Sequence, residues 1–273
     1  MQQTKINLAC GNTYVTDNGW INLDYNSTSP SVRRADLLGR LDLPDGGAEL
    51  VYSSHFLEHI PRSEVSGFLG ECFRVLAPGG GVRLVLPDLE NICRTYLEHR
   101  DLGEHEKADF VVLEMIDQCV RRECGGELGR LYRTLKASPR GKRNLIDFVR
   151  VRTGDDLLSG QPAHEGYLWG GRLARGLQRR AKRLWTYTVL NLLPTAFRAQ
   201  NVSLAGVGER HHWIWDFHQL LQVLEDVGFS EIERCSATSS RFSDFPFYPL
   251  DIDADGYPRK GSESMYIEAL KPD

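Results

Sequence analysis

Four short segments in the first ninety residues, taken in order, constrain the fold more than any other feature of this chain. Residues 6–10 and 20–24 form largely apolar runs that end beside Gly11 and at Asp24, and residues 50–53 and 82–86 form two more. Runs of this length between turn residues are typical of buried strands. Strands of this kind, alternating with helices, predict a parallel sheet covered on both sides.

Apolar residues at helical spacing follow these strands. One helix is predicted over residues 65–76, a second directly after Asp88, and a third over residues 217–227. Asp88 can cap the second helix, because a side-chain oxygen at that position accepts a hydrogen bond from a helix N–H group. Residues 231–235 and 265–270 are predicted as the last strands.

The middle of the chain has a different pattern. Helical segments at 110–120 and 172–193 alternate with loops rich in Gly, Pro and Arg, and no strand is predicted between residues 101 and 208. We therefore expect one sheet domain formed by residues 1–100 and 209–273. Residues 101–208 are predicted to be a helical insertion that acts as a lid over the bound substrate.

A basic run lies inside the predicted insertion. Residues 167–208 contain no Asp or Glu and have a formal charge of +7, although the whole chain has a net charge of −4. The basic residues are Arg172, Arg175, Arg179, Arg180, Lys182, Arg183 and Arg198. This pattern suits a helix lying on an anionic membrane, a cleft for a phosphorylated or nucleotide-linked sugar, or an ordinary solvated helix face. The sequence shows no RNA-binding motif that would accompany this basic run.

The predicted sheet places several polar residues at one edge. Ligands of open parallel sheets bind outside the carboxyl ends of the strands, where the strand order reverses. Gly11 would let the backbone approach a ligand closely, and Asp24 could accept hydrogen bonds from both hydroxyls of a ribose. Asp36 follows as a further acidic position near a base edge. These residues predict a site for a nucleoside-containing cofactor.

Three segments resemble motifs of the class I S-adenosylmethionine-dependent methyltransferases, in the right order. They read Ala35-Asp-Leu, Leu57-Glu-His-Ile and Phe73-Arg-Val-Leu-Ala-Pro-Gly-Gly. Within that family, the chain resembles the methyltransferases found with bacterial polysaccharide and glycosyl-transfer genes. Residues 113–129, 212–216 and 264–272 share that similarity.

The resemblance implies a Rossmann-like α/β methyltransferase sheet, mostly parallel with an antiparallel last strand. It implies S-adenosylmethionine as cofactor and S-adenosylhomocysteine as product. The cofactor-binding residues that it implies are Ala9, Cys10, Gly11 and Asn12 for the methionine part, Asp24 for the ribose, Asp36 and Leu37 for the adenine, and Ser54, His55 and Phe56 for the opposite side of the pocket.

The first motif departs from the usual family pattern. An acid and three glycines are usual there, whereas this chain has Asn7, Ala9, Gly11 and Thr13. Only 12 residues separate Gly11 from Asp24, against about 20 in the dinucleotide fingerprint. No full crossover helix fits this gap, so we expect residues 13–19 to cross compactly. The missing glycines argue against a dinucleotide, whose pyrophosphate needs a close backbone approach.

The predicted reaction is methyl transfer to an oxygen. The resemblance implies that this oxygen belongs to a saccharide. A hydroxyl acceptor needs a general base, and the predicted catalytic residues are His55, His59 and Asp88. His211 and His212 are further candidates from the end of the insertion. Some of these residues have an alternative role: Asp88 can simply cap its helix, His59 can orient the junction between strand and helix, and the two later histidines can pack the insertion onto the sheet domain.

Residues 55–59 also fit the H-x-x-E-H pattern of zinc proteases. On a helix, His55 and His59 would share one face beside Glu58 as general base. The motif follows a strand closely and Pro61 interrupts it, so no metal is expected. A zinc hydrolase that uses these three residues stays an alternative, as does a cofactor-binding protein without catalysis.

The remaining features bear on partners and location. No run approaches the roughly 18 apolar residues of a membrane span, and the N-terminus lacks the pattern of a signal peptide. The six cysteines show no metal-ligand spacing, so reduced thiols are expected. We expect a cytoplasmic protein that binds a small-molecule or lipid- or nucleotide-linked sugar acceptor and no nucleic acid. Peripheral contact with the inner face of the membrane through residues 172–193 is left open, as is the oligomeric state.

Overall fold

The computed structural model describes residues 4–17, 19–27, 29–158, 185–186, 188–194, 197–198, 202–203 and 208–273. Most of the predicted basic run, residues 172–183, therefore lies outside the described residues. No helix in the described parts of the chain is long and apolar enough to cross a membrane.

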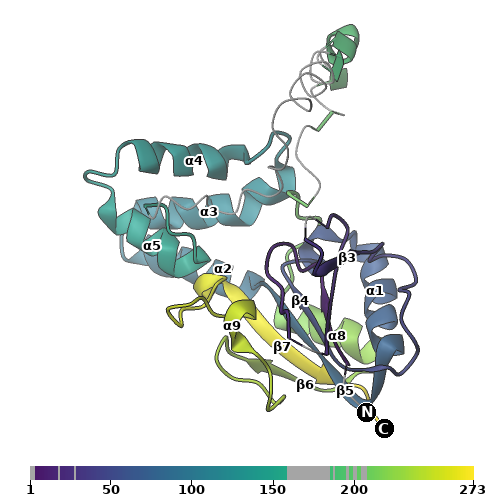
Figure 1. The fold of residues 1–273 in the computed structure, drawn as a ribbon. Helices are drawn as coiled ribbons and strands as arrows, with labels where there is room; N and C mark the ends of the chain where they lie inside the picture. The colour runs from purple at the N-terminus through teal and green to yellow at the C-terminus, as the bar shows by residue number, and fades with distance from the viewer. Residues whose placement is uncertain are drawn as a thin grey trace.

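A seven-stranded sheet forms the centre of the molecule (Figure 1). Its strand order is β3-β2-β1-β4-β5-β7-β6. The first five strands of the chain pair in parallel, and β7 is antiparallel to both of its neighbours, β5 and β6. The strands are β1 (Thr4–Leu8), β2 (Trp20–Asp24), β3 (Val32–Arg34), β4 (Ala48–Ser54), β5 (Leu76–Pro87), β6 (Ser230–Cys235) and β7 (Ser264–Leu270). The predicted Rossmann-like methyltransferase sheet, with its antiparallel last strand, is confirmed.

Helices lie beside the sheet and beyond one of its ends. They are α1 (Arg62–Val75), α2 (Leu89–Asp101), α3 (His105–Val120), α4 (Gly126–Ala137), α5 (Arg143–Thr153), α8 (Phe217–Val227) and α9 (Phe247–Leu250), with single 3-10 turns η1 (Leu57–His59) and η2 (Gly261–Glu263). The C-terminus and the start of β1 lie at one end of the sheet, and α3, α4 and α5 lie beyond the other end (Figure 1). Since the parallel strands run away from the start of β1, these helices lie near their carboxyl ends.

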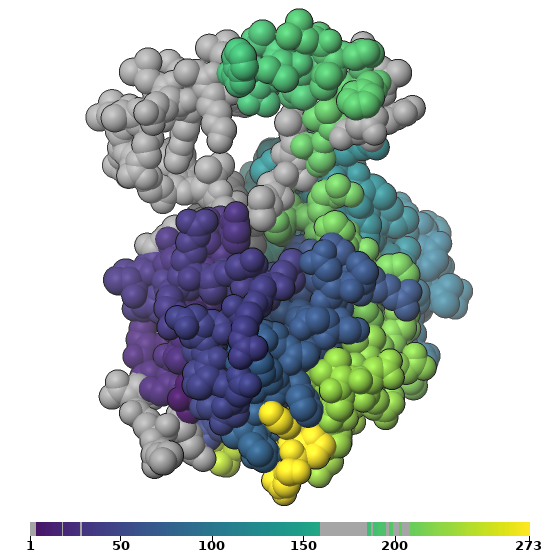
Figure 2. Space-filling view, turned by 90° about the vertical axis from the view of Figure 1, so that its right-hand side faces the viewer, coloured from purple at the N-terminus to yellow at the C-terminus, as the bar shows by residue number. Residues whose placement is uncertain are grey.

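The two faces of the sheet are covered differently. Successive strand residues point to opposite faces, so Val51 packs with α1 and α8 while Leu50 and Tyr52 pack with loops on the other face. The chain segment around Phe245 and Leu250 forms much of that second cover. Figure 2 shows the first face, where α1 (blue) and α8 (light green) lie side by side.

The helical region has a core of its own. Phe110 of α3 packs with Leu135 of α4 and with Leu145, Ile146 and Val149 of α5. This cluster is separate from the two that cover the sheet. It fits the expected helical insertion, whose boundaries and lid function stay predictions.

Several predicted elements differ from the structure. Strand β3 and helices α4 and α5 were not predicted, and α3 begins at His105 instead of residue 110. Helix α1 ends at Val75, and β5 begins directly after it, so the glycine run at residues 79–81 lies within a strand. Gly81 pairs between β4 and β7, and a Cβ atom there would lie 2.6 Å from the carbonyl oxygen of Ala269. Only a residue without a side chain fits this strand position.

Candidate active site

The strand order reverses between β1 and β4, which places the expected ligand site at their carboxyl ends. Directly after these two strands, Ala9 has φ 54° and His55 has φ 51°. Left-handed backbone at a residue with a side chain costs about 1–3 kcal/mol and is concentrated at functional sites. The strain therefore marks the same two strand ends as the topology.

Asp24 joins the end of β2 to the glycine turn. Its carboxylate is 3% exposed, and Oδ2 accepts a hydrogen bond from the N–H of Gly11 at 2.9 Å. Oδ1 accepts from the N–H of Asn26 at 2.9 Å. A carboxylate oxygen has two acceptor positions, so the same oxygens can also accept from ribose hydroxyls. The predicted ribose contact at Asp24 is compatible with this geometry and stays a prediction.

Two buried asparagines hold the short connection between β1 and β2. Asn7 Nδ2 donates to the carbonyl of Thr13 at 3.0 Å, and Asn22 Nδ2 donates to the carbonyl of Val15 at 2.8 Å. Asn22 Oδ1 also accepts from the N–H of Val15. The described residues between the strands form turns and no helix, as the short spacing predicted. Asn22 was not predicted as part of the site, although a buried amide inside an apolar strand is the signal that could have found it.

The predicted adenine residues follow β3. The N–H of Ala35 donates to the carbonyl of Asp24 at 2.9 Å, so the ends of β2 and β3 are joined. Asp36 is exposed, and its Oδ1 accepts from the N–H of Leu38. Leu37 is buried in the main core. Asp24 and Asp36 therefore lie at the same edge of the sheet. Their contacts with a ligand stay predictions.

His55 connects the end of β4 with two neighbours. The backbone N–H of His55 donates to the carbonyl of Val85. In its ring, Nδ1 lies 3.2 Å from Glu58 Oε1, and Nε2 lies 2.9 Å from Ser264 Oγ. Burial lowers the pKa of His55 to about 4, more strongly than the nearby carboxylate raises it. The imidazole is therefore neutral at pH 7 and can accept a proton.

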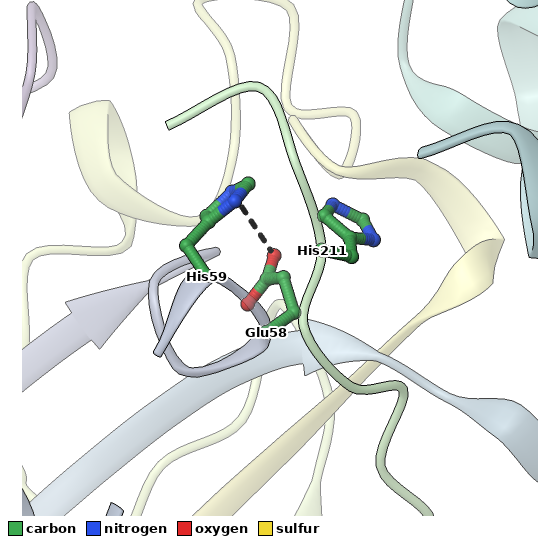
Figure 3. Close-up of side chains that lie close together, drawn as sticks. All are labelled: Glu58, His59 and His211. Atoms are coloured by element: carbon green, nitrogen blue, oxygen red, sulfur yellow. Dashed lines mark ion pairs between the residues drawn. The ribbon is translucent and has the colours of Figure 1, made fainter. Parts of the chain in front are cut away.

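Glu58 lies at the centre of a histidine cluster (Figure 3). Burial opposes its ionisation, but His55, His59 and His211 together lower its pKa to about 2. His59 comes from the same turn, and His211 comes from the segment that returns from the helical region. The N–H of His212 donates to the carbonyl of Glu58 at 2.6 Å, which fixes that segment against η1.

The H-x-x-E-H motif does not lie on a helix. Only Leu57–His59 form one 3-10 turn, and His55 precedes it with a left-handed backbone. His55 and His59 therefore do not share the helical face that the zinc-protease pattern requires. His211, which sequence analysis named only as a further candidate base, lies beside His59 instead, with the ring centroids 4.8 Å apart.

Asp88 is held by two partners. Oδ1 accepts from the N–H of Glu90 at 3.0 Å, which makes Asp88 the cap of α2, and Oδ2 accepts from Arg234 at 2.9 Å. The capping role is confirmed. Because the Asp88 carboxylate caps α2 and is paired with the cationic Arg234, the geometry favours His55 and His59 for proton transfer. All three catalytic assignments stay predictions.

The apolar residues after the basic run are described in part. Trp185 is 70% exposed and Leu192 is 79% exposed. The expected membrane contact of residues 172–193 stays a prediction, because all charged residues of this segment are outside the described ranges.

Comparison with known proteins indicates the class of enzyme. Residues 11–84 match the family described as "Methyltransferase domain". The match covers less than half of the chain. The match spans the glycine turn, Asp24, Asp36 and the Glu58 turn, and the strand order is that of the S-adenosylmethionine-dependent methyltransferases. The enzyme is an S-adenosylmethionine-dependent methyltransferase. No curated protein sequence matches the chain.

Solved structures of methyltransferases are similar at low sequence identity. An S-adenosylmethionine-dependent methyltransferase from Mesorhizobium loti has 15% identity and a TM-score of 0.39, covering 99% of this chain and 91% of that one. One from Thermotoga maritima has 10% identity and a TM-score of 0.40, covering 98% and 81%. Phosphoethanolamine N-methyltransferase 2 from Haemonchus contortus, in complex with S-adenosylmethionine, has 9% identity and a TM-score of 0.38, covering 100% and 49%. The fold assignment of this methyltransferase domain rests on its strand order.

Proposed function

We propose that this methyltransferase transfers the methyl group of S-adenosylmethionine to a hydroxyl oxygen of a saccharide or glycan-type acceptor. The observation that carries the proposal is the pair formed by His55 and Glu58 directly after β4, at the switch point of the sheet. The saccharide class rests on the resemblance of the sequence motifs to those of methyltransferases found with polysaccharide genes.

The reaction is an in-line displacement at the methyl carbon. An electron pair of the acceptor oxygen forms the new C–O bond, and the C–S bond breaks with its electron pair passing to sulfur. The acceptor loses its hydroxyl proton, and the products are a methyl ether and S-adenosylhomocysteine. Because the sulfonium is already activated, the protein's main tasks are to position the acceptor and to exclude water.

We assign proton removal to His55. The neutral ring can accept the hydroxyl proton, and the buried Glu58 carboxylate, 3.2 Å from Nδ1, would stabilise the imidazolium that forms. The other ring nitrogen, Nε2, already lies 2.9 Å from one hydroxyl oxygen, that of Ser264. On the cofactor side, Asp24 would bind the ribose, and residues 9–12 would contact the methionine part.

A screen of acceptors tests this function. Purified full-length protein is incubated with S-adenosylmethionine and a panel of nucleotide-linked and lipid-linked sugar precursors, and the products are analysed by mass spectrometry. We expect one sugar to gain a single methyl group, with an equal amount of S-adenosylhomocysteine. Methylation of amines with no sugar product would contradict the proposal.

A variant tests the base within the same assay. His55→Gln should lower kcat for the identified acceptor by about 10²–10⁴-fold, and calorimetry should still detect S-adenosylmethionine binding. Unchanged kcat would rule out His55 as the base.

A further inference from the structure

Glu58, His59 and His211 bring three metal-binding side chains to one place. One ligand atom of each lies within 4.8 Å of the others (Figure 3). Glu58 and His59 belong to η1, next to the end of β4. His211 belongs to the segment that follows the helical region in the sequence. The pairing of His211 with this turn is created by backbone hydrogen bonds, since the N–H of His211 donates to Gln118 and that of His212 to Glu58.

Three polar atoms of this cluster, two of Glu58 and one of His211, lack hydrogen bonds of normal geometry in the described structure. Glu58 is fully buried, and within the described structure neither of its carboxylate oxygens accepts a hydrogen bond of normal geometry. His211 is 5% exposed, and its Nδ1 atom is likewise without a hydrogen bond in the described parts of the chain. His55 Nδ1 lies 3.2 Å from Oε1, whereas Oε2 has no partner within the described structure. A buried carboxylate is strongly destabilising unless it is fully hydrogen-bonded or a cation compensates it.

The ring of His59 is oriented as in metal sites. Its Nδ1 lies 2.8 Å from the carbonyl oxygen of Arg210, and a carbonyl can only accept, so Nδ1 carries the proton. Nε2 then has a lone pair, and it lies 4.0 Å from Glu58 Oε1. Metal-binding histidines characteristically donate their other ring N–H to a carbonyl or carboxylate in this way. A lone pair and a carboxylate oxygen that face each other leave a position suited to a cation.

We propose that Glu58, His59 and His211 bind one divalent transition-metal ion of the zinc type, with an open coordination position. Two imidazoles and one carboxylate are a ligand set of catalytic zinc sites, which keep a position for water or substrate. Ligand atoms about 2.1 Å from one zinc ion lie about 3.4 Å apart, so the three side chains would draw together slightly on binding. His55 is not a ligand in this site but a neighbour that orients Glu58.

The site differs from the sequence expectations in two respects. No metal was expected, and the zinc alternative used His55, Glu58 and His59 on one helix. The structure instead replaces His55 by His211. If the proposed function holds, the open position would bind the acceptor hydroxyl and make it easier to deprotonate. That role rests on the proposed function, whereas metal binding itself can be measured without any acceptor.

Metal binding is tested on the full-length protein after removal of metals with a chelator. Calorimetric titration with Zn²⁺ should show one equivalent bound, and Co²⁺ should give the visible absorption bands of a four- or five-coordinate site. Glu58→Gln and His211→Ala should each weaken Zn²⁺ binding at least tenfold, while circular dichroism shows that the variants are folded. His212→Ala is the matched control, because this neighbouring side chain is exposed and should leave Zn²⁺ affinity unchanged.

The outcomes separate this proposal from the proposed function. Absence of stoichiometric Zn²⁺ and Co²⁺ binding, or affinity that survives both variants, overturns the metal site. If Zn²⁺ binds as expected but no hydroxyl acceptor is methylated, the metal site stands and the proposed function fails. If chelator-treated protein binds no Zn²⁺ but methylates a sugar at full rate, the proposed function stands and the metal site fails.

Discussion

The backbone N–H of Gly11 donates to Oδ2 of Asp24 at 2.9 Å, so the turn after β1 and the acid at the end of β2 form one unit. In this chain the acid therefore shapes the glycine turn in addition to its expected contact with ribose. The bond spans a connection with no helix in its described residues.

Asp24→Asn is expected to weaken S-adenosylmethionine binding. The amide keeps the size of the side chain but removes the charge, and hydrogen bonds to charged groups contribute about 1.5–3 kcal/mol each. We expect a loss of affinity of about 10–100-fold by calorimetry, and Asp24→Ala should abolish detectable binding. The exposed Asp42→Asn serves as control and should bind normally. Normal binding by Asp24→Ala would remove this residue from the cofactor site.

Asn22→Leu is expected to destabilise the protein. The substitution leaves the N–H and carbonyl of Val15 without their partner and removes an acceptor from Asn7. Unsatisfied buried groups cost about 1–3 kcal/mol each, so the free energy of unfolding should fall by about 2–4 kcal/mol in urea titrations. The Kd for S-adenosylmethionine should rise in the same variant, because the loop next to Gly11 loses its support. A variant as stable as the parent would show that the loop is held by other contacts.

Arg83→Met should be among the most destabilising single changes. Arg83 is fully buried and donates to Asp251 at 2.7 Å and to Glu268 at 2.6 Å. Removing one partner of a buried ion pair costs about 3–5 kcal/mol, since two carboxylates would be left without compensation. Thermal and urea unfolding measure the loss. The triple variant R83M/D251N/E268Q should recover part of it, and no recovery would assign the loss to packing instead of charge.

The Glu71–Arg74 pair should make stability depend on pH in the acid range. The hydrogen bond from Arg74 lowers the pKa of Glu71 below its ordinary value of 4.5. A carboxyl whose pKa is lower in the folded state stabilises the protein above its unfolded pKa, and this stabilisation is lost as pH falls through the folded pKa. Urea unfolding between about pH 6 and 3 should therefore show a declining free energy of unfolding. Glu71→Gln should decline less steeply, and identical slopes would exclude this residue as a cause.

The sequence by itself determined the elements whose pattern is local. Apolar spacing and turn residues within a few positions of each other indicate where along the chain the strands other than β3 lie. The same local signals indicate the helices α1 and α8 and the cap at Asp88. The spacing between Gly11 and Asp24 was enough to exclude a crossover helix. Strand β3 escaped prediction because it has three residues, two of them exposed arginines.

Only the tertiary structure decided which distant side chains meet. Nothing near His211 in the sequence indicates that it would lie beside Glu58, and nothing near Arg83 indicates Asp251 and Glu268 as partners. The left-handed backbone of Ala9 and His55 is equally invisible in their residue types. Local periodicity reports how a segment buries its own apolar face, whereas these contacts depend on how the sheet, the helical region and the returning chain pack together. The methyltransferase sheet could thus be predicted from its sequence pattern, but the composition of the cluster at its edge required the packed molecule.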